Sequence, residues 1–334
     1  MTAASLPEPL DALAPRHDIP RKGRSGFMLV DHRQVHFLEW GHGGLPPVLA
    51  LHWGGQTAYM FEDLGAALGT RYHIVAPDLP DHGDSDGLGA PVTSRSNGEP
   101  QDIDGDIDGD IDDDIVPEAR GSLGPEAIAA SLPPLLSELG MPRAALVGAS
   151  LGGLTSIRFA ASHPAAVGAV VLIDVGHRLE ADGVKRIIDF MRAHESFGSL
   201  DEAAVEISKY LPQRQNVRPE TLSRNLRQRG DGRWIWKHGF SRRVRGVGDD
   251  LDPTNYVEYF LSGVREAAAS ITCPVLVLRG AASDVLSQQG AEEVAALIPD
   301  SQLATVERAG HLAAGDNPHS TVNLISAFLD SHTW

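Results

Sequence analysis

The sequence predicts an α/β protein with a mostly parallel, eight-stranded sheet that has helices on both faces. Most strand-like runs are continuous apolar segments, as strands buried on both faces require. Helical patterns alternate with the later runs, which favours parallel pairing. The first two or three runs follow one another without helices, so we expect an antiparallel edge there. A chain of 334 residues that is 42% hydrophobic can bury such a core.

The individual elements follow from these patterns in chain order. Strands are predicted at 26–30, 34–40, 48–52, 73–77, 144–147, 169–174, 275–278 and 302–306. Helical patterns cover 58–68, 125–139, 151–161, 288–298 and 320–329. The core therefore divides into a first part at 26–176 and a second part at 271–334.

Two segments depart from this rhythm. Residues 1–25 are rich in proline, alanine and charge, which predicts a flexible tail and not a signal peptide. Residues 177–270 are charged and helical in pattern and contain no convincing strand. Because this segment is inserted between two core strands, we expect it to form a helical cap over the carboxyl edge of the sheet.

A third departure, at 88–122, is acidic and of low complexity. The unit Asp-Ile-Asp-Gly at 102–105 repeats at 106–109 and decays at 110–113. Such a run buries too little surface to offset its ordering entropy, which favours a disordered loop. The alternative is calcium binding, because Asp104, Asp106 and Asp108 resemble half of an EF-hand loop. Ile115 stands where that loop needs a bidentate glutamate, so we favour the loop.

The overall composition excludes several function classes. A formal charge of −17 argues against nucleic acid and anionic membrane surfaces as partners. The single cysteine, Cys273, cannot form an internal disulfide and is interpreted as a small buried hydrophobe. No apolar stretch approaches membrane-spanning length, so we expect a cytoplasmic protein.

The most informative motif is Gly148-Ala149-Ser150-Leu151-Gly152. It follows a short apolar run and precedes an apolar helix, which is the pattern of a nucleophile elbow. The two glycines are needed because side chains there would clash as strand and helix close around Ser150. The amide of Leu151 would then point to a developing oxyanion.

An activated serine needs a base and an orienting acid, and both have candidates in the order Ser, Asp, His. Asp284 follows the apolar run 275–278, and His311 follows the last predicted strand. Asp284 is also a candidate N-cap of the next helix. The loop after residue 51 supplies Gly54 as the second oxyanion donor, with Leu151 as its partner.

Histidines near this loop receive a plainer interpretation. His52 is predicted to hold the loop by hydrogen bonds. A metal site built on His52, His73 and His82 is disfavoured, because these residues include no short-spaced ligand pair.

The motifs together resemble the α/β-hydrolase family over nearly all of the core. The matching segments are 52–55, 78–85, 148–152, 280–284 and 310–311. Trp53 stands where the family often has glycine and is expected to narrow or cover the oxyanion loop. Relatives with an aspartate nucleophile, such as epoxide hydrolases, are disfavoured by Ser150. Some relatives carry the triad acid at the strand end occupied by Asp174; we assign Asp284, whose loop matches the more usual position.

The resemblance implies hydrolysis of a small-molecule carboxylic ester by Ser150, His311 and Asp284, with no metal or organic cofactor. Trp53, Trp234 and Trp236 are candidate substrate contacts, and Phe240 belongs to the same aromatic cluster. Cleavage of a carbon–carbon bond or a lactone by the same triad stays open, as does a non-catalytic binding protein. The sequence leaves the oligomeric state undetermined.

Overall fold

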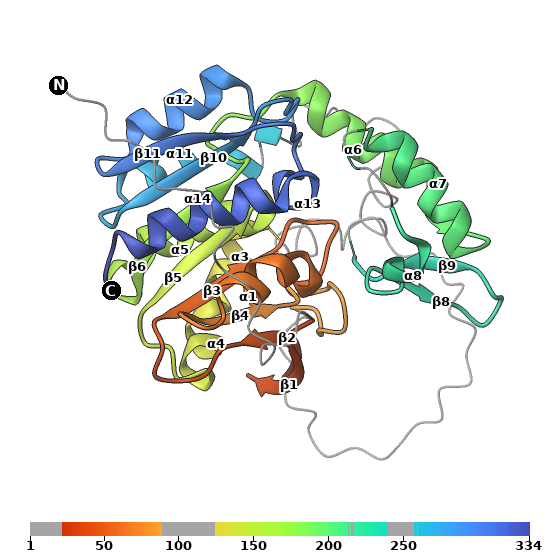
Figure 1. Cartoon of the computed structure of the whole chain (residues 1–334), viewed down its shortest axis with the longest axis horizontal. Helices are drawn as coiled ribbons and strands as arrows, with labels where there is room; N and C mark the ends of the chain where they lie inside the picture. Colours follow the sequence, from red (N-terminus) through yellow and green to blue (C-terminus); the bar gives the residue numbers. More distant parts are fainter. Residues whose placement is uncertain (1–21, 89–123, 213, 215–216, 240–256, 259) are drawn as a thin grey trace, which may run out of the picture.

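A computed structural model describes residues 22–88, 124–212, 214, 217–239, 257–258 and 260–334 (Figure 1). Its main sheet has eight strands in the order β1-β2-β4-β3-β5-β6-β10-β11. In chain order they are β1 (Arg24–Val30), β2 (Arg33–Trp40), β3 (Pro47–Leu51), β4 (His73–Pro77), β5 (Ala144–Ala149), β6 (Val167–Ile173), β10 (Val275–Gly280) and β11 (Ser301–Val306).

The pairing confirms a mostly parallel sheet. β1 pairs with β2 and β2 with β4 in antiparallel fashion, whereas the remaining neighbours are parallel. The antiparallel edge therefore involves the first two strands, and β3 lies inside the sheet between β4 and β5. Each predicted strand is present, with β1 beginning at Arg24 inside the segment predicted as tail.

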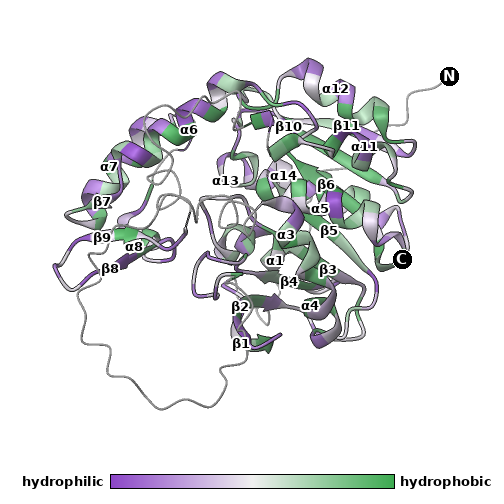
Figure 2. Cartoon of the chain, turned by 180° about the vertical axis from the view of Figure 1, so that it is seen from behind, coloured by the Kyte–Doolittle hydropathy of each residue, from purple (hydrophilic) through white to green (hydrophobic). Residues whose placement is uncertain are grey.

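Helices cover both faces and produce two hydrophobic clusters. Alternate residues of β3 show the division, because Val48 and Ala50 join one cluster whereas Leu49 and Leu51 join the other. The first face carries η1 (Ala58–Phe61), α1 (Glu62–Leu68), α13 (Ala313–Asp316) and α14 (Pro318–Asp330). The second face carries α3 (Pro125–Ala130), α4 (Leu132–Glu138), α5 (Leu151–Ser162), α11 (Val264–Ala269) and α12 (Gln288–Leu297). Figure 2 shows the hydrophobic residues gathered on the strands between these layers.

A second region is inserted between β6 and β10, which are neighbours in the sheet. It contains α6 (Ala181–Ala193), β7 (Ser196–Phe197), α7 (Leu200–Tyr210), α8 (Pro219–Leu222), β8 (Leu226–Gln228) and β9 (Trp234–Trp236). In Figure 1 these elements extend to one side of the core. The three strands form a small sheet in the order β7-β9-β8, so the prediction of a segment without strands was wrong. Strands of two or three residues are too short to produce a period-two pattern.

Some sequence predictions lie outside the described residues. These are the tail at 1–21, the acidic repeat at 102–113 with nearly all of 88–122, and Phe240. Within the described part of the chain, none of the helices has the length and apolar character needed to cross a membrane.

Candidate active site

Ser150 occupies a strained turn between β5 and α5. Its φ of 47° and ψ of −111° lie in a region that non-glycine residues rarely adopt. A side chain at Gly148 would collide with the Gly152 carbonyl and Ser156, and one at Gly152 would collide with the Leu51 carbonyl. The glycines are therefore required by close backbone approach. This is the local geometry of a nucleophile elbow.

His311 is positioned by Asp174. Its Nδ1 lies 2.8 Å from Oδ2 of Asp174, which is fully buried at the carboxyl end of β6. The same carboxylate accepts hydrogen bonds from the Gly280 amide at 2.8 Å and the Ser283 hydroxyl at 2.6 Å. The histidine partner predicted from the sequence, Asp284, is therefore corrected to Asp174.

Asp284 has a different partner. Its Oδ2 lies 3.0 Å from Nη2 of Arg186 on α6, in a partly exposed ion pair. Asp284 and Asp174 both follow core strands, but only the Asp174 side chain contacts the His311 imidazole. Asp174 has a φ of 52°, and its own amide donates to the Leu278 carbonyl at 2.7 Å. The chain thus bends sharply at this residue, directly beside β10.

The two ring nitrogens of His311 have different surroundings. Nδ1 faces the Asp174 carboxylate and donates to it, which leaves the Nε2 lone pair available. Nε2 is buried and has no hydrogen-bond partner among the described residues. His311 and Ser150 line the same cavity, and the edge of the Trp53 ring faces His311 with centroids 6.2 Å apart.

The loop after β3 is held by buried histidines. Nδ1 of His52 donates to the Trp53 carbonyl at 2.8 Å, and its Nε2 accepts from the Leu79 amide at 2.9 Å. Burial, with the nearby His82 as a smaller cause, lowers the pKa of His52 to about 3. His52 is therefore a neutral imidazole in a single tautomer, and its hydrogen bonds match the structural role predicted for it.

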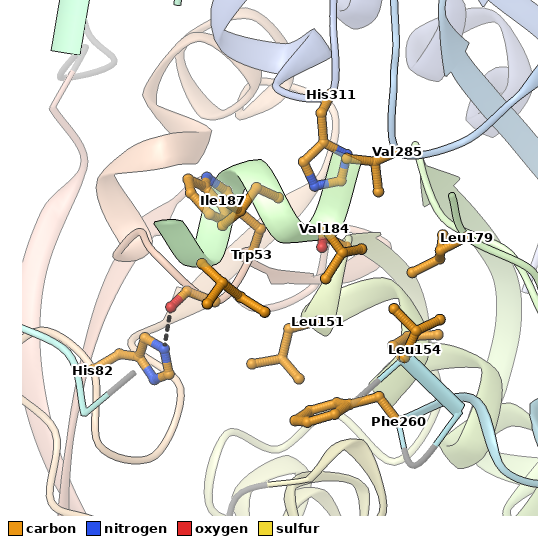
Figure 3. Close-up of a pocket in the computed structure, with 14 residues that line it drawn as sticks. Trp53, His82, Leu151, Leu154, Leu179, Val184, Ile187, Phe260, Val285 and His311 are labelled. Carbon is orange, nitrogen blue, oxygen red and sulfur yellow. Dashed lines mark hydrogen bonds between the residues drawn. The ribbon is translucent and has the colours of Figure 1, made fainter. Parts of the chain in front are cut away.

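His82 holds the other side of this loop. Its Nδ1 lies 2.8 Å from the Pro80 carbonyl. Its Nε2 lies 2.9 Å from the Gly54 carbonyl, the contact that is dashed in Figure 3. The two contacts tie the imidazole to both neighbouring backbone segments, so it fixes the loop that carries Gly54. No sequence signal beyond its position in the 78–85 motif pointed to this contact.

The two candidate oxyanion donors are adjacent. A Cβ at Gly54 would lie 3.6 Å from the Leu151 side chain, an ordinary contact distance. Steric crowding is therefore not what requires glycine at position 54. Neither the Gly54 amide nor the Leu151 amide donates to another group within the described ranges. Both amides are thus available to a bound oxygen.

The cavity beside Ser150, which we call the nucleophile cavity, has a volume of about 100 Å³ and mostly apolar walls. Trp53, Gly54, His82, Ser150 and His311 belong to its lining. The apolar walls come from α5, from the segment around α6, from residues near α11 and from the loop after β10: Leu151, Leu154, Leu179, Val184, Ile187, Ile188, Val257, Phe260 and Val285. Figure 3 labels these residues except Ile188 and Val257.

The three tryptophans that were predicted to contact substrate lie in different places. Trp53 lines the nucleophile cavity, Trp236 lines a larger cavity farther from Ser150, and Trp234 lines neither. Trp236 donates from Nε1 to the His194 carbonyl at 2.7 Å and packs edge-on against Phe197. The amphipathic pattern of 181–193 was the sequence signal that could have identified Ile187 instead.

One group of side chains has the composition of a metal site. Ligand atoms of His36, Asp78 and Asp84 lie within 4.8 Å of one another. His36 Nδ1 already contacts Asp78 at 2.7 Å, and the other Asp78 oxygen accepts from the Ala58 amide at 2.7 Å. Asp84 pairs with Lys237 at 3.1 Å. These contacts account for the cluster as a structural network that supports the loops around Gly54.

Comparison with known proteins identifies the family. A model of the alpha/beta hydrolase fold matches residues 46–318, so the chain belongs to the α/β-hydrolase family. The family predicted from the motifs is confirmed, and with it a hydrolase class of enzyme.

Relatives within this family carry different activities. The chain is 26% identical over 303 residues to the esterase Rv0045c of Mycobacterium tuberculosis, covering 88% of this chain and 86% of that protein. It is 26% identical to 2-(acetamidomethylene)succinate hydrolase of Mesorhizobium japonicum, covering 96% of this chain and 98% of that protein. A crystal structure of an α/β hydrolase from Novosphingobium aromaticivorans superimposes with a TM-score of 0.68 at 25% identity, covering 92% of this chain and 98% of that one.

Proposed function

We propose that this protein hydrolyses a carboxylic ester through an acyl-enzyme intermediate. The observation that carries the proposal is the position of His311, hydrogen-bonded to buried Asp174 on one side and open to the cavity of Ser150 on the other. A serine that shares a cavity with an imidazole, itself hydrogen-bonded to a carboxylate, has the groups needed for a nucleophile, its base and its orienting acid.

The reaction uses each group in a defined step. Nε2 of His311 takes the proton of Ser150 as its oxygen attacks the carbonyl carbon, and later gives that proton to the leaving alcohol. Asp174 keeps Nδ1 protonated and stabilises the imidazolium as it forms. A water molecule activated by the same Nε2 then releases the acid and regenerates the serine.

Two backbone amides stabilise the negatively charged oxygen of the tetrahedral intermediate by donating hydrogen bonds to it. Leu151 is the first residue of α5, where the helix dipole also favours negative charge. Gly54 lies on the loop that His52 and His82 hold from either side. Donors fixed in advance cost no reorganisation during the reaction, and one such donor contributes about 3–4 kcal/mol of transition-state stabilisation.

The inserted region acts as a cap in this proposal. Residues 177–270 contribute Leu179, Val184, Ile187, Ile188, Val257 and Phe260 to the wall of the nucleophile cavity. Apolar side chains over the serine exclude water and select the acyl group by size. The esterase among the relatives supports an ester as the substrate, although relatives with other hydrolase activities exist.

The direct test is Ser150→Ala, with Ser162→Ala, at the last residue of α5, as the matched control. We expect Ser150→Ala to lower kcat on p-nitrophenyl esters by at least about a thousandfold and to abolish labelling by a fluorophosphonate. Ser162 donates to a backbone carbonyl on the far end of α5, so its variant should keep both properties. Equal melting temperatures would show that the fold is intact. Substantial ester turnover by Ser150→Ala would exclude this mechanism.

A further inference from the structure

Three cavities that share lining residues adjoin one another, beginning with the cavity of the candidate active site. The nucleophile cavity shares Trp53, Ile187 and His311 with an intermediate cavity of about 130 Å³. The intermediate cavity shares Trp53, Tyr210 and Leu312 with a third one, of about 540 Å³. Shared walls make these spaces neighbours, and Trp53 borders all three.

The largest cavity, which we call the arginine chamber, lies between the core and the inserted region. Its charged lining residues are four cations, Lys22, Arg214, Arg218 and Arg224, and two acids, Glu62 and Asp63. The whole chain has a formal charge of −17. A local excess of positive charge in an acidic protein marks a place where an anion is attracted.

Most charged groups near the chamber already have close partners. Arg224 hydrogen-bonds to Glu62, and its guanidinium also lies 5.1 Å from the centre of the Tyr59 ring. In the intermediate cavity, Arg186 pairs with Asp284 at 3.0 Å. Arg218 is 67% exposed and lies at the margin of ion-pair distance, 4.0 Å, from Glu220. These cations are either neutralised or well hydrated.

Arg214 differs from them. Its side chain is 26% exposed, and its closest acid is Asp316, at 3.6 Å between Nε and Oδ1. That distance is too long for a hydrogen bond, and neither atom has a hydrogen-bond partner among the described residues. Burial lowers the pKa of Arg214, and burial also raises the pKa of Asp316. The pair is thus incompletely compensated, and an additional anion would stabilise the guanidinium.

The backbone makes room for this guanidinium. Nη2 of Arg214 lies against Gly315, where a Cβ would collide with it. Gly315 belongs to α13, which begins two residues after His311. The arginine is therefore packed beside the segment that carries the base, and it lines the chamber that adjoins the cavity of Ser150.

We propose that the arginine chamber binds a carboxylate or other anionic group on the alcohol portion of the substrate, with Arg214 contacting that anion. This inference rests on the proposed ester hydrolysis. The leaving alcohol receives its proton from His311, so it lies on the imidazole side, toward Leu312 and the chamber. The acyl group then occupies the apolar nucleophile cavity. The substrate class is an ester of a hydroxy acid with a small apolar acyl group.

The test compares two esters that differ in one charge: 4-(butanoyloxy)butanoate and its carboxamide, 4-(butanoyloxy)butanamide. We expect the protein to prefer the carboxylate by about tenfold or more in kcat/KM, as a charge-assisted contact supplies. Arg214→Gln should bring this ratio close to one, and Arg214→Lys should restore part of it. Arg227→Gln, at an exposed arginine of β8 that does not line the chamber, is the matched control and should keep the preference. Acid release at constant pH measures all four proteins.

Binding gives a readout that does not depend on turnover. In the Ser150→Ala protein, calorimetric titration should show tighter binding of the carboxylate ester than of the carboxamide, and Arg214→Gln should remove the difference. If Arg214→Gln lowered kcat/KM and affinity equally for both esters, the arginine would have a structural role and the inference would be overturned. Equal turnover of both esters by the unaltered protein would also overturn it, while ester hydrolysis stood. Charge-selective binding without any ester turnover would keep the chamber and refute the reaction.

Discussion

The core sheet and the inserted region contribute different things to the candidate site. Loops at the carboxyl ends of β3, β5, β6 and β11 carry Gly54, Ser150, Asp174 and His311, each held by backbone turns or buried hydrogen bonds. The inserted region supplies mainly apolar side chains, such as Ile187, to the cavity wall. Polar groups in a buried network tolerate little displacement, whereas apolar walls tolerate exchange of similar volumes. Chemistry is therefore expected to depend on the core, and substrate choice on the insertion.

The strongest test of this division is the orienting acid. Asp174→Asn should lower kcat on esters by about 10⁴-fold, because an amide in place of the carboxylate favours the wrong imidazole tautomer. Asp284→Asn removes a carboxylate from the next strand end and serves as the matched control; its kcat should stay near that of the unaltered protein. Steady-state kinetics of both variants measure the contrast. A larger loss in Asp284→Asn would mean that the loop rearranges when substrate binds.

This contrast also shows what the sequence could not reveal. The serine, the histidine and the Gly54 loop were predictable because each depends on local constraints, such as the glycines around Ser150. The choice between Asp174 and Asp284 depends on the direction of a side chain across neighbouring strands. Two acids at two strand ends look alike in sequence. The deciding features, the positive φ of Asp174 and the Gly280 amide aimed at it, arise only when β6 and β10 are paired.

The strands of the core and those of the insertion also differ in how far the sequence predicts them. Strands such as β5 and β6 are buried along their whole length, which produces continuous apolar runs that sequence analysis detects. The small sheet of the insertion has strands of two or three residues, which leave no such pattern. Trp234 and Trp236 were predicted to contact substrate because they are large aromatic residues. Whether they reach the nucleophile cavity depends on how this small sheet packs, which the sequence does not reveal.

The second prediction concerns the cavity wall. Ile187→Ala should shift relative kcat/KM between bulky and small acyl esters by about 1–3 kcal/mol, because the side chain lines the nucleophile cavity. Trp234→Ala is the control from the same region, and its relative specificity should change little. The measurement is a panel of p-nitrophenyl esters from acetate to octanoate. Equal changes on all chain lengths in Ile187→Ala would indicate a general packing defect and not selection by size.

A third prediction concerns the histidine that holds the core loop. The pKa of His52 is lowered to about 3 in the folded protein, mainly by burial, and returns to its ordinary value of about 6.5 on unfolding. Between these values the unfolded chain binds a proton that the folded chain does not. Stability should therefore fall as the pH drops below about 6.5, by about 2 kcal/mol at pH 5 from this group alone.

Denaturant unfolding at pH 7 and pH 5 measures this effect, with His52→Gln as the comparison. The variant should be less stable at both values, because it loses one of the two loop hydrogen bonds. The change in its free energy of unfolding between pH 7 and pH 5 should, however, be smaller than that of the unaltered protein by about 2 kcal/mol. An identical pH dependence in both proteins would mean that His52 is not the group that titrates.

The smallest effect is expected where the two regions meet through exposed charges. Arg186 on α6 and Asp284 on the core loop form an ion pair whose side chains are 62% and 34% exposed. Water screens such a pair, and holding two side chains in one geometry costs entropy, so its coupling free energy should be below about 1 kcal/mol. A double-mutant cycle with Arg186→Gln and Asp284→Asn, read by denaturant unfolding at low and high salt, measures it. A salt-insensitive coupling of several kcal/mol would mean that this ion pair is an important link between the insertion and the core.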